Sequence, residues 1–402
     1  MNRWKVVFAG FLLALMGGIS YAWGVFVIPM MERFSWTKMQ TTLPFTVFML
    51  AFAFTMALGG RLQDTFGPKK VATYGALLFF ISYASAALIG HFEQPIWLIL
   101  TYGLIGGTAC GLTYSCVAPP ARKWFPDKPA LAISLAVMGF GLAAIIVAPL
   151  KAKILIPQFG IEITFLMIAI LTSAVSLIAA MMLKNPPENW IPEGWNPAQA
   201  KKTTRILHET IPSEMIKLPL FWLIWGMFLL VVSGGLIMLG LVPSYAQRII
   251  NLSPLQASLT ISIFSAVNGF GRPFAGYLAD KIGIISVMIG TFLLQAAVFI
   301  TFNHIAISPV SLYISVGLIG WAYAVIVALF PTLVAVCFGA RNLGVNYGLV
   351  FTAFGFGAVT PAIGAKIFDI TGSFSVIFIT VGTLSALGTF VALFLKKKYD
   401  LS

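Results

Sequence analysis

The stretch "SAVNGFGRPFAGYLADKIG", from Ser265 to Gly283, decides how the rest of this 402-residue chain is interpreted. Most of its residues are apolar or small, yet it carries Arg272 eight residues before Asp280. Small residues such as its glycines allow helices to approach one another closely in a membrane. A cation inside an otherwise apolar helix marks a membrane segment in which the charged residue has a specific function.

The composition of the whole chain is that of a membrane protein. Hydrophobic residues make up 59% of the chain and charged residues 9%, whereas soluble domains carry about 25% charged residues. An apolar run of about 20 residues can cross the hydrocarbon core as a helix. We predict twelve such spans, at residues 6–31, 39–59, 68–90, 95–120, 129–150, 160–183, 218–246, 254–279, 283–303, 308–337, 343–365 and 373–395. The first is too long and too aromatic for a cleaved signal peptide, so we expect it to be retained.

The net charge of +13 orients the protein and needs no nucleic acid as a partner. With a cytoplasmic N-terminus, the inner segments hold eighteen of the 25 basic residues, the outer segments hold six, and Arg272 remains. The positive-inside rule therefore places both termini in the cytoplasm, and we expect a protein of the plasma (inner) membrane. The three cysteines fall inside predicted spans and form no disulfide framework.

An internal repeat divides the chain into two halves. "GRLQDTFG" from Gly60 matches "GYLADKIG" from Gly276, and "MGFG" from Met138 matches "FGFG" from Phe354, both at an offset of 216 residues. Two motif pairs at one offset indicate a duplicated six-helix unit. We predict bundles at 1–184 and 217–402, joined by a proline-rich and charged cytoplasmic linker at 185–216.

The repeated motif supplies candidates for a conformational latch: Gly60, Asp64 and Gly67 in the first copy, and Gly276 and Asp280 in the second. Glycines permit close helix contact, and an aspartate can meet a helix N-terminus or a basic side chain in one state. The motif resembles the cytoplasmic signature of the major facilitator superfamily. That resemblance implies an all-α membrane protein with twelve transmembrane helices in two six-helix bundles related by a pseudo-two-fold axis. It also implies a carrier rather than an enzyme, and we expect a monomer in the lipid bilayer.

Arg272 lies near the bilayer midplane if Asp280 marks the cytoplasmic interface. Eight helical residues rise about 12 Å, against about 15 Å for half of the hydrocarbon core. Burial there costs about 2.5–3.5 kcal/mol, so the arginine must face the bundle interior. All twelve acidic residues fall in loops or at the ends of spans. A guanidinium without a carboxylate from the protein favours an anionic ligand, and its planar fork suits a carboxylate.

Three further motifs narrow the resemblance. "SYAWGVFVIP" (20–29), "ARKWFPDKPALA" (121–132) and "NGFGRPFAG" (268–276) look like the oxalate:formate antiporter group and the monocarboxylate transporters. In that group an arginine of helix eight, here Arg272, binds the substrate carboxylate. Oxalate carriers have a lysine of helix eleven where this chain has Phe354, so a monocarboxylate is favoured over oxalate. The lysine and aspartate that couple protons in animal lactate carriers correspond to Val25 and Asn268, so their coupling residues cannot be transferred.

The predicted substrate site combines one cation with polar and aromatic walls. Its members are Arg272, Asn268, Tyr21, Tyr114, Tyr323, Trp321, Phe140 and Phe354. Plain core or lipid packing is an alternative for each aromatic residue, because the chain has 34 Phe, 11 Tyr and 10 Trp. "GFGRPFAG" lacks the spacing of a nucleotide loop and follows no strand, so no cofactor is expected, and no metal site is expected either.

The sequence thus predicts a secondary transporter of a small monocarboxylate such as lactate, pyruvate or formate, which alternates access around Arg272. Proton symport and exchange for a counter-anion both remain open. The alternatives keep the fold but change the substrate to oxalate or another dicarboxylate, an inorganic anion, a drug or a sugar. A transporter-shaped sensor or membrane enzyme is a third alternative, although the predicted spans contain no catalytic constellation.

Overall fold

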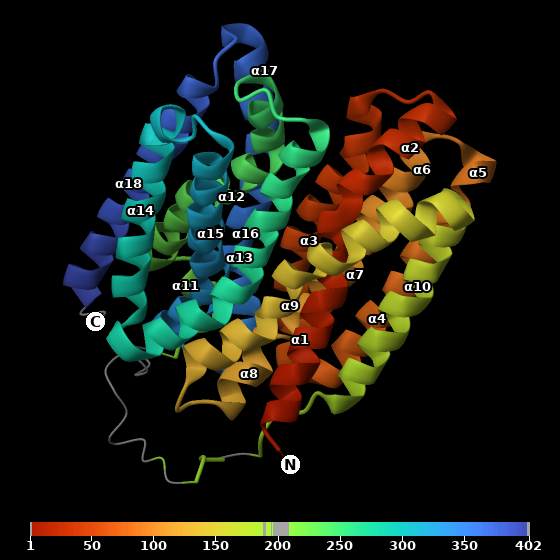
Figure 1. Ribbon diagram of the computed structural model, residues 1–402. Helices are drawn as coiled ribbons and strands as arrows, with labels where there is room; N and C mark the ends of the chain where they lie inside the picture. The colour runs from red at the N-terminus through yellow and green to blue at the C-terminus, as the bar shows by residue number, and fades with distance from the viewer. Residues whose placement is uncertain (1, 188–189, 194, 196–208, 400–402) are drawn as a thin grey trace.

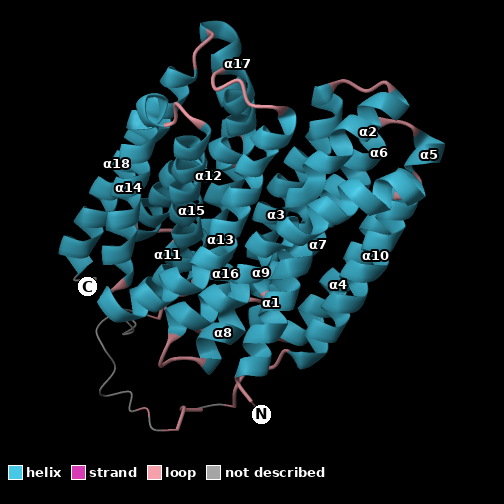
Figure 2. Cartoon of the chain, viewed as in Figure 1, coloured by secondary structure: helices cyan, strands magenta, loops and turns pink. Residues whose placement is uncertain are grey.

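The computed structural model describes residues 2–187, 190–193, 195 and 209–399. Helices make up all the regular structure in this part of the chain, which contains no strand (Figure 2). Much of the predicted linker at 185–216 lies outside the described residues, so its structure is not discussed. The N-terminal end of the first helix and the C-terminal end of the last lie at the same end of the bundle, which we call the terminal face (Figure 1). The other end is called the opposite face.

The first half of the chain crosses the bundle six times. Its elements are α1 (Trp4–Gly18), η1 (Ile19–Trp23), α2 (Gly24–Phe34), α3 (Lys38–Phe66), α4 (Pro68–Ala86), α5 (Ile89–Phe92), α6 (Pro95–Leu98), η2 (Ile99–Gly106), α7 (Gly107–Ser115), α8 (Ala118–Trp124), α9 (Pro129–Leu150), η3 (Lys151–Leu155) and α10 (Ile156–Met182). Here η1 is a 3₁₀-helical segment, and η2 and η3 are π-helical turns within longer helices.

The second half also crosses six times. Its elements are α11 (Pro212–Met215), α12 (Pro219–Arg248), α13 (Pro254–Ile282), α14 (Ile284–Ile305), α15 (Pro309–Phe338), α16 (Leu343–Gly357), α17 (Thr360–Thr371) and α18 (Phe374–Tyr399). Figure 1 shows the two halves side by side, the first from red to yellow-green and the second from green to blue. The closest packing between them joins α3 to α16 and α9 to α13.

Nine helical segments of the described residues are long and apolar enough to cross a membrane. One of them, Pro129–Met182, contains two crossings, because Gly160 breaks the helix with φ 77°. The more polar α4 and α13 complete the predicted twelve. Residues 151–159, which lie between the predicted spans 129–150 and 160–183, are helical up to the break at Gly160. Lys151 is buried, with its Nζ 4.6 Å from the Phe26 ring centroid.

The repeat of 216 residues also governs how helices begin and end. Thr37 and Ser253 occupy equivalent positions, and each caps its helix through a reciprocal pair of hydrogen bonds with the glutamine three residues on. Gly67 and Gly283 end the same two helices with φ 86° and 95°, a conformation that only glycine adopts readily. The repeat of the sequence is therefore a repeat of local structure.

Candidate functional site

The terminal face is closed by two equivalent contacts between the halves. The Leu131 and Ala130 N–H groups at the start of α9 donate to the Asp280 carboxylate at 2.9 and 3.2 Å. The Val345 N–H in the first turn of α16 donates to Asp64 at 3.1 Å, and the Gln63 side-chain amide donates to the same carboxylate. Each aspartate thus meets the N-terminus of a helix of the other half, where negative charge is stabilised.

The glycines of the repeated motif serve two different purposes. A Cβ on Gly60 would overlap the backbone of Gly344, and a Cβ on Gly276 would lie 2.5 Å from the Ala130 carbonyl oxygen. These two glycines therefore permit the contact between the halves. Gly67 has no neighbour within 4 Å of such a Cβ, so its contribution is the positive φ at the end of α3.

On the other side of the midplane a cavity separates the halves. Its volume is about 410 Å³. Its lining comes from both halves and is mostly apolar, with hydroxyl groups among it: Tyr21, Trp23, Gly24, Val27, Thr42, Phe45, Thr46, Met49, Leu236, Leu239, Gly240, Ile261, Ser265, Ala358, Pro361 and Ala362. We call it the outer cavity. The two halves are therefore in contact at the terminal face and separated by the outer cavity towards the opposite face.

Arg272 lies at the centre of the molecule and is 1% exposed. Its Nη1 donates to the Val137 carbonyl of α9 at 2.6 Å, and its Nε and Nη2 both donate to Asn268 Oδ1 at 3.2 Å. Asn268 precedes it by one turn on α13, so the two side chains share a face. These bonds use three of the five guanidinium N–H groups, and the Tyr114 hydroxyl also lies within hydrogen-bonding reach of the guanidinium.

No carboxylate of the described residues pairs with this arginine. The ion pairs in that part of the chain are Arg3–Asp127, at 2.6 Å, and Arg33–Glu162. Neither of these two ion pairs involves Arg272. The hydrogen bonds to Val137 and Asn268 satisfy part of its donor capacity but do not neutralise its charge.

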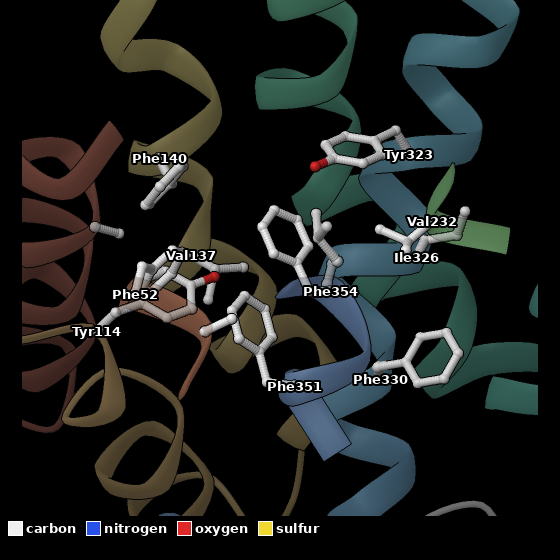
Figure 3. Close-up of a cluster of buried hydrophobic side chains, with 14 of the residues drawn as sticks. Phe52, Tyr114, Val137, Phe140, Val232, Tyr323, Ile326, Phe330, Phe351 and Phe354 are labelled. Atoms are coloured by element: carbon white, nitrogen blue, oxygen red, sulfur yellow. The ribbon is translucent and has the colours of Figure 1, made fainter. Parts of the chain in front are cut away.

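Arg272 reaches a very small chamber between the halves. The chamber measures about 10 Å³, enough for roughly one water molecule. It is lined by Tyr21, Phe52, Tyr114, Phe140, Arg272, Val327, Phe351 and Phe354. Figure 3 shows Phe351 and Phe354 of the second half facing Phe52, Tyr114 and Phe140 of the first. The two halves are thus in contact around the arginine.

Tyr21 belongs to both the chamber and the outer cavity. Its hydroxyl lies 3.2 Å from that of Tyr323, and the two phenols share a hydrogen bond between the halves. The Tyr21 ring also meets the Phe140 ring edge-on at 4.9 Å. A ligand that enters through the outer cavity must therefore pass Tyr21 to reach the guanidinium.

Seven of the eight predicted substrate-site residues come together here. Five line the chamber, while Asn268 binds Arg272 and Tyr323 binds Tyr21. Trp321 was predicted as a cavity wall, but it packs against Phe274, with ring centroids 5.6 Å apart, and Phe274 is 57% exposed. Trp321 therefore faces away from the chamber.

Sequence reasoning missed three residues of the chamber, Phe52, Val327 and Phe351. Apolar residues give little signal in a chain this rich in them. Phe351 could have been found, since it lies three residues before Phe354 on the same helix and such residues share a face.

Comparison with known proteins agrees with this architecture. The family model described as Major Facilitator Superfamily matches residues 6–358 and 233–401. The chain belongs to the major facilitator superfamily. It is 27% identical to the oxalate:formate antiporter of Oxalobacter formigenes over 97% of this chain and 91% of that protein. It is 22% identical to monocarboxylate transporter 13 of Bos taurus, over 96% and 87% of the two chains.

A solved structure supports the fold independently. The crystal structure of the major facilitator transporter FucP in the outward conformation aligns with a TM-score of 0.69 at 14% identity, over 96% of this chain and 98% of that one. At this identity the likeness concerns the fold alone. This superfamily member is therefore an all-α transporter with two bundles of six membrane helices.

Proposed function

We propose that this transporter carries a small monocarboxylate, of the lactate, pyruvate or formate kind, and that Arg272 binds its carboxylate. The observation that carries the proposal is a guanidinium buried between the two halves with no carboxylate partner among the described residues. A guanidinium can bind a carboxylate through two parallel hydrogen bonds. The anion would neutralise a charge that the surrounding side chains leave uncompensated.

The walls of the chamber favour one carboxylate over two. Phe354 occupies the position at which the resembling oxalate carriers have a lysine, and the chamber holds Arg272 as its single cation. A second carboxylate would be buried without a partner, at a cost of several kcal/mol. The likeness to the oxalate:formate antiporter keeps oxalate as the second candidate.

The transport cycle that we propose uses the two latches. Asp64 and Asp280 hold the terminal face shut while the ligand enters from the opposite face. The ligand would part Tyr21 from Tyr323 and bind Arg272, with Tyr114 as a further hydrogen-bonding partner. The bundles at 1–184 and 217–402 would then rock about this site and open the terminal face.

Orientation follows from the distribution of basic residues. Eighteen fall on the segments assigned to the terminal side and six on the opposite side. We therefore propose that the terminal face and the linker at 185–216 are cytoplasmic, in a monomer of the plasma (inner) membrane. Substrate would enter from outside in the conformation described here.

Uptake into proteoliposomes tests the role of the arginine. We expect saturable uptake of labelled lactate to fall at least about 30-fold in Arg272→Ala, because losing one partner of a buried charged pair costs about 2–5 kcal/mol. Arg272→Lys keeps the charge but loses the planar fork and should also be strongly impaired. Arg33→Ala, which removes a cation paired with Glu162 away from the site, is the control. Undiminished uptake by both Arg272 variants would exclude the proposal.

The same vesicles separate the remaining alternatives. Uptake driven by an imposed pH gradient alone indicates proton symport, and uptake that needs an anion on the far side indicates exchange. Inhibition of transport by nitrate, phosphate, a sugar or a drug, but by no carboxylate, would favour a carrier for another substrate.

A further inference from the structure

The hydroxyl of Tyr347 is buried in the core of the transporter without a hydrogen-bond partner among the described residues. The side chain is 2% exposed. A buried polar group without a partner destabilises a fold, so its presence calls for a reason. Two other tyrosine hydroxyls of the central site, those of Tyr21 and Tyr323, bind one another.

The position of Tyr347 on α16 suggests the reason. It lies four residues before Phe351, so the two side chains share one face of the helix, and their ring centroids are 5.6 Å apart. Phe351 lines the Arg272 chamber. Four residues rise about 6 Å along a helix, so Tyr347 lies about one turn from Phe351 towards the terminal face. Its phenol is still within electrostatic range of Arg272 and Tyr114.

Two other buried polar atoms, Gln63 Oε1 and Ser134 Oγ, also lack a hydrogen-bond partner among the described residues. Gln63 Oε1 lies on α3, where the amide of Gln63 is 2.6 Å from a Cβ built on Gly344 of the other half. Ser134 Oγ lies on α9, 2.5 Å from a Cβ built on Gly276. Both therefore lie where the halves touch on the terminal side. These polar groups would become accessible when that side opens.

We propose that Tyr347 is a release site for the transported carboxylate, reached after Phe351 moves aside on opening of the terminal face. This inference rests on the proposed function. The phenol would donate to a carboxylate oxygen as the ligand leaves Arg272, and Gln63 and Ser134 would line the way out. In the present conformation the Tyr347 ring packs against Phe351, and Phe351 but not Tyr347 lines the chamber.

The test compares two tyrosines that differ in position alone. Tyr347→Phe removes the proposed contact. Tyr102→Phe is the matched control, because the Tyr102 hydroxyl is equally buried and also lacks a partner among the described residues. Tyr102 lies within the first half, where its ring stacks on Trp23 at 4.1 Å and on Phe48 at 5.0 Å. Lactate KM is measured separately from each side of oriented proteoliposomes.

We expect Tyr347→Phe to raise the KM for lactate at the terminal face about five- to tenfold, because the variant loses a hydrogen bond from the phenol to the charged carboxylate. KM at the opposite face should change less than twofold, and Tyr102→Phe should change neither. Equal effects of Tyr347→Phe on both sides, or equal effects of the two variants, would overturn the release site. Absence of carboxylate transport in the unmodified protein would instead refute the proposed function.

Discussion

At the scale of single residues, selectivity depends on how many cations the chamber contains. Phe354 lines it beside Arg272. We predict that Phe354→Lys raises uptake of labelled oxalate relative to lactate by at least about tenfold, because the new ammonium can pair with a second carboxylate that otherwise stays buried and unpaired. Phe354→Met alters the side chain without adding charge and should leave the ratio unchanged. An equal change of the oxalate-to-lactate ratio in both variants would show that the size of the side chain, not its charge, determines the selectivity.

The distance between Arg272 and Asp280 was predictable, because both lie on one continuous helix whose rise per residue is fixed. Among the described residues no carboxylate pairs with Arg272. The direction in which each aromatic side chain points was not predictable. Trp321 and Tyr323 are both aromatic residues in an apolar helix, yet only Tyr323 reaches the site. The direction depends on the rotation of the helix about its axis, and a uniformly apolar sequence gives no pattern from which that rotation can be predicted.

At the scale of helices, closure depends on glycines at the crossing of α3 and α16. We predict that Gly60→Ala weakens the closed terminal face, because the added Cβ would overlap the Gly344 backbone. Overpacking of this kind costs about 1–3 kcal/mol. Labelling of a Gln63→Cys variant by a maleimide supplied from the terminal side should rise several-fold. Gly290→Ala on α14 is the control, since its Cβ meets nothing within 4 Å.

Helix ends were predictable where local chemistry sets them. Gly67 and Gly283 follow from the repeat, whereas the end of the fifth crossing did not follow from the charges of Lys151 and Lys153. Lys151 is buried against Phe26 instead of marking a loop. The cation–π contact with Phe26 stabilises the buried ammonium, so a charged residue locates a helix end less reliably than a glycine with positive φ.

At the scale of the whole molecule, the sequence determines two bundles but not which end is open, because the same residues must fit every state of the cycle. In the conformation described above, contacts from both Asp64 and Asp280 close the terminal face. If the halves rock as rigid bodies, both contacts belong to a single two-state equilibrium. Weakening one contact must then open the other.

We therefore predict that Asp64→Asn also opens the distant contact made by Asp280. Loss of the charge at the α16 N-terminus weakens a contact worth about 1.5–3 kcal/mol. We expect maleimide labelling from the terminal side to rise several-fold not only at Gln63→Cys beside Asp64, but also at Ser134→Cys beside Gly276 and the second latch. Asp280→Asn should likewise raise labelling at Ser134→Cys beside the altered contact and at Gln63→Cys beside the other contact. A rise confined to the cysteine beside the altered aspartate would mean that each contact opens locally, and rigid-body rocking of the two bundles would be wrong.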